Sequence, residues 1–408
     1  MISVAEALAH VTSSLRPLAA EQVALSDALG RVLAEDVASR LTQPPVDVSA
    51  MDGYAVRAAD VAGVPVTLKV IGESPAGGAF DGVLGAGQAV RTFTGAMVAD
   101  GADAIVIQEV TDAEGDTVIV KESTAPGTYI RRAGQDFRAG QVLLAAGKVL
   151  TARDVGLAAA MNVPWLKVRR RPRIAILATG DEVVMPGEPL ARNQIISSNS
   201  VALDAYVRAL GGVPIILGIA RDDEESLHAM LAGAEGADML VTIGGASVGD
   251  HDLVRKVLGD EGLDLTFYKV AMRPGKPLIF GRLGNVPVLG MPGNPVSAGV
   301  SSIIFLGPAM EVMLGLRRPG EDAAEPAPTA LLGRHLEAND QRQDYLRAKL
   351  GRDDKGSLVA TPFDKQDSAM MARLAAADCL VVRPPNAPPA EAGERVEIVP
   401  LATGLLSI

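Results

Sequence analysis

The stretch that most constrains the fold runs from Met239 to Asp252, where a short apolar segment is followed at once by glycines. Residues 239–243 are apolar except for one threonine, which is typical of a strand that is covered on both faces of a parallel sheet. The glycines that follow allow positive φ and a close approach of the backbone to a ligand. The stretch therefore predicts a buried strand, a tight turn and the start of a helix.

This turn combines anion-binding groups with acids. Its N–H groups can hold an anion, and the small residues that provide them are Gly244, Gly245, Ser247 and Gly249. Asp250 and Asp252 come next. Bare carboxylates would repel phosphates, so a divalent cation that bridges the two would explain the pattern. The stretch indicates a site for a phosphate-bearing ligand; the alternative is an ordinary strand-to-helix turn with solvated acids.

The same strand–turn–helix unit occurs twice before this stretch. Ile174–Gly180 and Val213–Ala220 are apolar segments that end in turns, and each is followed by a segment with helical spacing. Repeats of this kind predict a parallel sheet with ligands at the carboxyl ends of its strands. Glu182, Asp222 and Asp252 all fall at that edge.

Positive charge follows in the next segment. Lys269, Arg273 and Lys276 surround a Pro-Gly turn between two predicted strands, and such cations can bind phosphates or an oxyanion. The loop Met291–Pro295, MPGNP, then precedes a helix whose first N–H groups face the same edge.

An acid and a hydroxyl stand out in the first third of the chain. The loop SAMDGYA, from Ser49 to Ala55, contains Asp52, and ordered loops of this kind often carry function. Thr94 lies where a predicted strand ends and can offer its hydroxyl to a ligand. The alternatives are structural: Asp52 capping a turn and Thr94 capping the next segment.

Length and pattern predict several domains. A chain of 408 residues is too long to fold around a single hydrophobic core. We expect a discontinuous helical domain over 1–25 and 137–170, in which the helices near Ser3–Ser14 and Thr151–Met161 pack together. A β-rich insertion over 26–136, the α/β domain over 171–320 and a C-terminal β-rich domain over 321–408 complete the prediction.

Composition excludes several classes of function. The net charge of −11 opposes general binding to nucleic acid or anionic membranes. No leader pattern or long uninterrupted apolar segment is present, which favours a cytoplasmic protein without a membrane span. The single Cys379 and four scattered histidines show no spacing typical of a Cys/His metal cage.

Seven motifs together resemble one family, the molybdopterin molybdenumtransferases, which include bacterial MoeA and the E domain of gephyrin. In chain order the motifs are LGRVLAEDV, SAMDGYA, TGA, TGDE, GGASVGDHD, RPGKP and MPGNP, and they cover essentially the whole chain. The resemblance implies insertion of molybdate into adenylylated molybdopterin with release of AMP. It also implies an elongated homodimer of four-domain subunits, with a central three-layer α/β molybdopterin-binding domain and an active site shared between subunits.

The resemblance assigns roles to particular residues. The matched functional residues are Asp52, Thr94, Glu182, Asp222, Asp252, Lys269 and Lys276, and of these Glu182, Asp222 and Asp252 are the expected Mg²⁺ ligands. Expected substrate-binding residues are Gly244, Gly245, Ser247, Gly249, Arg273, Pro292, Asn294, Pro295, Arg347 and Ser368, the last two for molybdate. Many relatives have Lys where this chain has Arg273, so a planar guanidinium replaces a compact ammonium.

The implied mechanism is electrostatic, because no Ser/His/Asp or Cys/His set is present. Two other functions remain open at this point. A molybdopterin adenylyltransferase, the enzyme one step earlier and an expected partner, shares the α/β domain but is a compact single-domain protein. A non-catalytic scaffold such as gephyrin would tolerate loss of the acids, and all of the acids are present here.

Overall fold

The computed structural model describes residues 1–245, 253–319 and 327–401, and the chain divides into two compact units. Unit 1 contains Met1–Glu35, Ala146–Arg153 and Lys167–Ile408, and unit 2 contains Asp36–Ala145 and Asp154–Leu166. The four domain boundaries expected from the sequence stay a prediction, because this division separates only two bodies.

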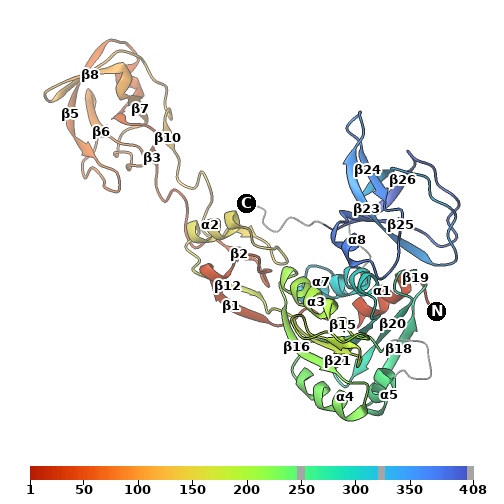
Figure 1. The fold of residues 1–408 in the computed structure, drawn as a ribbon. Helices are drawn as coiled ribbons and strands as arrows, with labels where there is room; N and C mark the ends of the chain where they lie inside the picture. The colour runs from red at the N-terminus through yellow and green to blue at the C-terminus, as the bar shows by residue number, and fades with distance from the viewer. Residues whose placement is uncertain (246–252, 320–326, 402–408) are drawn as a thin grey trace. The chain divides into compact units, whose positions relative to one another are not determined.

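The centre of unit 1 is a six-stranded sheet (Figure 1). Its strands, in spatial order, are β16 (Val213–Ala220), β13 (Arg173–Thr179), β17 (Met239–Ile243), β21 (Val286–Met291), β20 (Pro277–Leu283) and β18 (Leu263–Lys269). The first four are parallel, and β20 and β18 add antiparallel hairpins at one edge. The predicted parallel sheet is confirmed.

Helices cover both faces of this sheet, because alternate side chains of each strand point to opposite faces. Ile174 and Ile176 of β13 pack in one core cluster, and Ala175 and Leu177 pack in another. The first cluster receives helices α1 (Val4–Ser13), α3 (Ser198–Ala209), α6 (Pro295–Ser301) and α7 (Gly307–Leu314). Helices α4 (Glu224–Leu231) and α5 (Leu253–Asp260) pack in the second cluster. The domain is therefore a three-layer α/β structure, as expected.

Local capping signals place the helix starts, but they do not decide what a helix packs against. Ser3 accepts a hydrogen bond from the Glu6 N–H at the start of α1, as its spacing predicts. The buried side of α1 packs against α7. Most of α2 (Ala152–Ala160) lies in unit 2, so the expected pairing of α1 with this helix stays a prediction. The N-cap residue of α3 is Ser197, whose side chain makes no capping hydrogen bond.

One long apolar helical segment packs against the central sheet. Pro295–Leu314 combines α6, a π-helical turn over Ser302–Leu306 and α7, and it is the one helix among the described residues that is long and apolar enough to cross a membrane. Within the fold 78% of its most apolar window is buried. Its apolar character is thus accounted for by packing against the sheet.

The end of unit 1 is a second six-stranded sheet. It consists of β19 (Met272–Arg273), β23 (Gln343–Arg352), β24 (Leu358–Pro362), β22 (Thr329–Leu332), β26 (Arg395–Pro400) and β25 (Cys379–Arg383). Because β25 also pairs with β23, the strands close into a barrel-like ring. Small residues such as Ala348, Ala360 and Cys379 fill its interior, and α8 (Met371–Ala375) lies in one of its connections. The C-terminal β-rich domain is confirmed.

Unit 2 is built around a third six-stranded sheet, ordered β7 (Ala104–Ile107), β4 (Gly53–Val56), β6 (Gln88–Thr92), β5 (Val66–Ser74), β9 (Thr117–Val120) and β8 (Thr111–Glu114). Tyr54 and Val56 pack on one side and Ala55 on the other. The predicted β-rich character of this region is confirmed. Four short strand pairs also occur in the described part of the two units: β3 (Val48–Ser49) with β10 (Ile130–Arg131), β2 (Val37–Ala38) with β11 (Val142–Leu144), β14 (Val183–Val184) with β15 (Ile195–Ile196), and β1 (Ala20–Ala24) with β12 (Trp165–Arg169).

The burial of the central sheet gives a stability prediction. Leu289 in β21 is fully buried, whereas Leu265 on β18 is 39% exposed. Leu289→Ala should lower the free energy of unfolding by about 2–5 kcal/mol, because it leaves a cavity in the core. Leu265→Ala, the control, should change it by about 0.5 kcal/mol or less. Denaturant unfolding measures both, and equal losses would contradict the assignment of Leu289 to the core.

Candidate functional site

The carboxyl ends of β13 and β17 form the natural ligand-binding edge of the α/β sheet. These two strands are neighbours, and the connection from β13 leads to β16 on one side, whereas the connection from β17 leads toward β18 on the other. Such a reversal of strand order leaves a crevice at the strand ends. Glu182 follows the first strand and Gly244 follows the second.

The first glycines of the turn after β17 pass close to this edge. Gly244 has φ of +88° and Gly245 has φ of +63°. A Cβ atom on Gly244 would lie 2.9 Å from the Thr179 carbonyl oxygen, so a side chain is excluded both by conformation and by space. The expected anion-binding residues Ser247 and Gly249, and the acids Asp250 and Asp252, lie outside the described residues.

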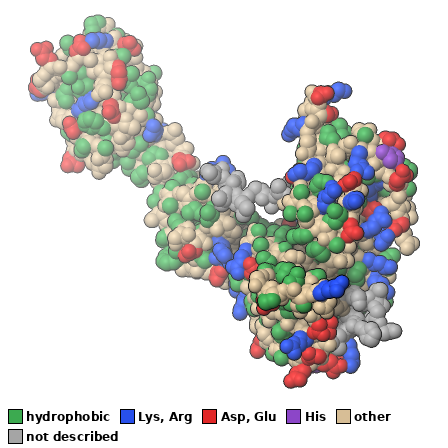
Figure 2. All heavy atoms as spheres, in the orientation of Figure 1, with side chains coloured by type: hydrophobic (Ala, Val, Ile, Leu, Met, Phe, Trp, Pro, Cys, Tyr) green, Lys and Arg blue, Asp and Glu red, His purple; other side chains and the backbone are tan. Residues whose placement is uncertain are grey.

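Two of the three predicted metal ligands come together beside this turn. The Asp222 N–H donates to Oδ1 of Asp181 at 3.2 Å. Burial, followed by the negative charges of Asp181 and Glu182, raises the pKa of Asp222 above its usual value. The sequence did not single out Asp181 as a site residue, although its place directly after a buried strand was a signal. Figure 2 shows further acidic side chains around α4, where Asp223 is used as the helix cap through a 2.7 Å bond from the Ser226 N–H.

These carboxylates do not form a complete metal cage by themselves. Within the described ranges no group of three His, Cys, Asp or Glu side chains is arranged to hold a metal ion. Burial is the first cause of the raised pKa of Asp222, and the negative charges of Asp181 and Glu182 add to it. A bound cation would favour the charged form of this carboxyl.

The predicted lysines flank the turn between β18 and β20. Lys269 ends β18, and its Nζ lies 4.7 Å from the centre of the Tyr268 ring. The Val270 N–H donates to the Lys276 carbonyl at 3.0 Å and so closes the turn. Neither lysine forms an ion pair with any residue in the described part of the chain. Both charges are therefore available to an anionic ligand.

Arg273, in the same turn, has a protein partner. Its guanidinium makes a two-point ion pair with Asp344, including a 2.8 Å bond from Nε to Oδ1. Asp344 is buried in β23, and β19 pairs with β23 in parallel. Only a planar fork of donors satisfies both carboxylate oxygens in this way. Arg273 thus joins the lysine turn to the C-terminal barrel, and its expected contact with substrate stays a prediction.

The MPGNP loop is held to the same edge by backbone contacts. The Gly244 N–H donates to the Met291 carbonyl at 3.0 Å, and Nδ2 of Asn199 donates to the Gly293 carbonyl at 2.7 Å. Pro292 is buried. Asn294 precedes α6 without a side-chain capping bond, and Pro295 is its first residue. Asn199 was not among the predicted site residues.

The two expected molybdate-binding residues lie in neighbouring segments of the barrel. Arg347 is 1% exposed, and its Nε and Nη1 atoms donate to Gln366 Oε1 at 3.1 Å and to the Asp367 carbonyl at 2.8 Å. Its Nη2 atom has no hydrogen-bond partner among the described residues. Ser368 comes next in the chain after Asp367, and its carbonyl accepts from the Val296 N–H at the start of α6. Burial is the main cause that lowers the pKa of Arg347.

Asp52 and Thr94 form a pair within unit 2. Oδ1 of Asp52 accepts from the Thr94 N–H at 2.7 Å and from its hydroxyl at 2.8 Å. Both hydrogen bonds lower the pKa of Asp52, and the bond from the Thr94 backbone N–H contributes more than the bond from its hydroxyl. Gly53, the residue after Asp52, begins β4. A Cβ atom on Gly53 would lie 2.0 Å from the Val106 carbonyl oxygen, so a side chain is excluded at this position. The structure thus brings together two residues that are 42 positions apart.

Family models match almost all of this arrangement. Residues 2–162 match the MoeA N-terminal region (domain I and II), 175–311 a probable molybdopterin-binding domain, and 329–401 the MoeA C-terminal region (domain IV). A protein of Mycobacterium tuberculosis (strain ATCC 25618 / H37Rv) named molybdopterin molybdenumtransferase 2 is 37% identical over 403 residues, which is 96% of each chain. The chain belongs to the MoeA family. The family resemblance of its motifs is confirmed.

Other MoeA-family proteins agree with this assignment. The molybdopterin molybdenumtransferase of Haemophilus influenzae (strain ATCC 51907 / DSM 11121 / KW20 / Rd) is 34% identical over 386 residues, covering 94% of both chains. A crystal structure of the molybdopterin biosynthesis MoeA protein from Pyrococcus horikoshii superimposes with a TM-score of 0.81 at 28% identity, over 98% of this chain and 99% of that one. The multidomain fold expected for the family is therefore confirmed.

The acidic edge gives a second prediction. Asp181→Asn should lower the pKa of Asp222 toward its ordinary value, because one of the two repelling charges is lost while burial remains. NMR titration of the Asp222 carboxyl measures this change. Asp260→Asn, which alters an exposed acid at the end of α5, is the control. An unchanged or higher pKa in Asp181→Asn would show that Asp181 does not act on Asp222.

Proposed function

We propose that this MoeA-family chain is a molybdopterin molybdenumtransferase that inserts molybdate into adenylylated molybdopterin and releases AMP. The observation that carries the proposal is the Nη2 atom of Arg347, a buried cationic donor without a partner among the described residues. A buried donor of this kind costs stability unless a ligand uses it. Molybdate is a small oxyanion that can accept from this atom.

The anion-binding role extends to the lysine turn. Lys269 and Lys276 carry charges that no described carboxylate neutralises, and Ser368 follows the loop that holds Arg347. Arg347 and Ser368 bind molybdate, and the two lysines bind the phosphate oxygens of the adenylylated substrate. Cations placed where negative charge collects on a leaving group stabilise the transition state.

Glu182 and Asp222 fit the role of Mg²⁺ ligands. Mg²⁺ usually binds one or two carboxylates together with waters and substrate phosphates, and it does not need a cage made of protein alone. Asp252, outside the described residues, is the third ligand that we propose. When bound, the ion supplies charge neutralisation at the pyrophosphate. Burial and the neighbouring acids raise the pKa of Asp222, so a bound cation would favour its charged form.

Asp52 contributes a fixed negative charge. Both bonds from Thr94 end on Oδ1, which leaves Oδ2 to accept a hydrogen bond from substrate. Since its pKa is lowered, this carboxyl stays ionised throughout the neutral range. We propose that Asp52 completes the active site across the interface of a homodimer in the cytoplasm, where the adenylyltransferase supplies the substrate.

The two other functions have less support. A single-domain adenylyltransferase would not account for relatives that match 96% of the chain, including both β-rich regions. A scaffold without catalysis has no use for the one guanidinium nitrogen of Arg347, Nη2, that lacks a hydrogen-bond partner among the described residues. The test is incubation of the protein with adenylylated molybdopterin, Mg²⁺ and molybdate. Molybdate-dependent release of AMP is expected, and its absence would overturn the enzymatic function.

Arg347 allows a sharper prediction. Arg347→Lys should raise the molybdate concentration for half-maximal AMP release at least about tenfold, because a charge-assisted hydrogen bond is lost. Arg383→Lys is a matched control, since Arg383 is also buried in a barrel strand and has an unpartnered Nη1 among the described residues. Similar changes in both variants, or a lower thermal midpoint with unchanged molybdate dependence, would assign Arg347 to the fold.

The shared site is tested by mixing subunits. Asp52→Ala and Lys276→Ala should each abolish AMP release, because each removes a charge from the site. If every site takes Asp52 from one subunit and Lys276 from the other, heterodimers of the two variants keep one intact site and recover partial activity. Mass spectrometry establishes subunit exchange. No recovery after exchange would place both residues in the site of one subunit.

A further inference from the structure

The Gln366 side chain makes four hydrogen bonds in the C-terminal barrel, and three of them join it to Arg347. Its Oε1 atom accepts from the Arg347 backbone N–H at 3.0 Å and from Nε of the guanidinium at 3.1 Å. Its Nε2 atom donates to the carbonyls of Arg347 and Phe363, both at 3.0 Å. An amide offers two acceptor positions and two donor positions, so every hydrogen-bonding position of Gln366 is used.

These partners allow the Gln366 amide only one orientation. A flipped amide would place its N–H groups opposite two donors of Arg347 and its oxygen opposite two carbonyls. Donors that face donors leave buried polar groups unpaired, which costs stability. The contacts themselves therefore decide which end of the side chain is the oxygen, and Gln366 is a fixed support for the guanidinium.

This support determines the direction of the one free nitrogen of Arg347. Nε is held by Gln366, and Nη1 donates to the Asp367 carbonyl at 2.8 Å. A guanidinium is planar, so fixing two of its nitrogens also fixes the third. Nη2, the atom without a partner among the described residues, is consequently held in one place.

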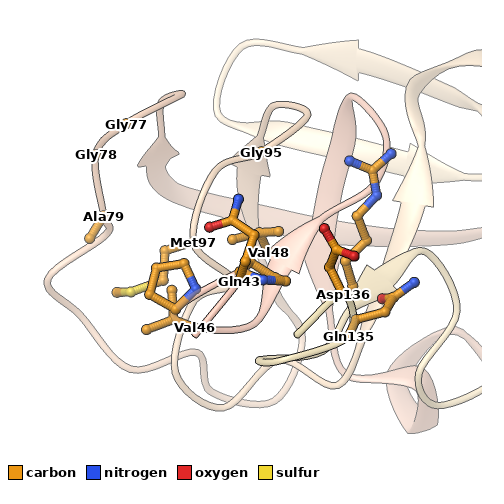
Figure 3. Close-up of a pocket in the computed structure, with 13 residues that line it drawn as sticks. Gln43, Val46, Val48, Gly77, Gly78, Ala79, Gly95, Met97, Gln135 and Asp136 are labelled. Atoms are coloured by element: carbon orange, nitrogen blue, oxygen red, sulfur yellow. The ribbon is translucent and has the colours of Figure 1, made fainter. Parts of the chain in front are cut away.

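Unpartnered polar groups are significant only where bulk water cannot reach them. Gln135 and Asp136 line a cavity of unit 2 (Figure 3), but both residues are exposed, so water can satisfy their polar atoms. Arg347 differs, because it is 1% exposed and its Nη2 atom is buried. A bound oxyanion can supply the acceptor that this nitrogen lacks.

The amide of Gln366 also carries no charge, which matters for binding an anion. In the described part of the chain no carboxylate forms an ion pair with Arg347. A glutamate in place of Gln366 could accept from the same two donors, but its negative charge would offset the charge of the guanidinium. Gln366 thus holds Arg347 and leaves its positive charge available.

We propose, on the basis of the function proposed above, that Gln366 is a positioning residue for molybdate. It fixes the Arg347 guanidinium so that Nη2 donates to the oxyanion, and its neutral amide preserves the charge that attracts the oxyanion. A side chain that is already held in its binding geometry loses less conformational freedom when the ligand binds. Molybdate therefore meets a donor that is in place beforehand.

The first test replaces Gln366 by methionine, which has a similar length and cannot make these hydrogen bonds. Gln366→Met should raise the molybdate concentration for half-maximal AMP release at least about tenfold, with little change in the maximal rate at saturating molybdate. Gln343→Met is the matched control, because Gln343 lies in the same strand and its side chain donates to the Tyr345 hydroxyl at 2.8 Å. The control should keep the molybdate dependence of the parent.

The second variant separates positioning for an anion from a role in the fold alone. Gln366→Glu keeps two acceptors for Arg347 and adds a negative charge, so it should also raise the half-maximal molybdate concentration at least about tenfold. If Gln366 served only the fold, both variants would lower the thermal midpoint and leave the molybdate dependence unchanged. That result would overturn the inference.

A third measurement does not depend on activity. NMR of the full chain should show that the Arg347 Nε–H exchanges with water more slowly in the parent than in Gln366→Met, and equal rates would overturn the inference. Molybdate-dependent AMP release with the same half-maximal molybdate concentration in the parent and Gln366→Met would overturn it too, while the enzymatic function would stand. No molybdate-dependent AMP release by the parent would overturn the proposed function and, with it, this role of Gln366.

Discussion

The burial of both faces of the central sheet is the constraint on which the rest of unit 1 depends. Every residue of β17 is buried, and the neighbouring strands send alternate side chains into two separate cores. Such a sheet has no surface for chemistry except its edges. The acids, glycines and lysines of the candidate site therefore gather in the loops at the strand ends, where backbone N–H groups and charges can meet a ligand.

The Arg273–Asp344 ion pair links that edge to the barrel. It joins the turn that carries Lys269 and Lys276 to β23, the strand that also carries Arg347. Because one partner is almost fully buried, the pair has a fixed geometry and is screened less than a surface pair. Arg273 is suited to holding the turn, since a lysine would offer no fork to both oxygens of Asp344.

In unit 2 small apolar clusters cover the two faces of the sheet, and the polar groups of the candidate site lie in loops. Gly53 permits the contact of β4 with β7 and leaves Asp52 at the strand start, where two donors from Thr94 keep it charged. Unit 2 therefore presents the charged acceptor Asp52 directly before β4.

Several elements and their order could be predicted from the sequence, because they depend on local chemistry. Apolar runs predicted β13, β16 and β17, the cap at Ser3 predicted α1, and ordered motifs indicated the MoeA family. Only the tertiary structure decided which distant groups meet. The packing of α1 on α7, the pairing of Arg273 with Asp344 and the burial of Arg347 against Gln366 join residues that no local pattern connects. Their free energy comes from shape and charge complementarity between segments, and that complementarity exists only after the chain has folded.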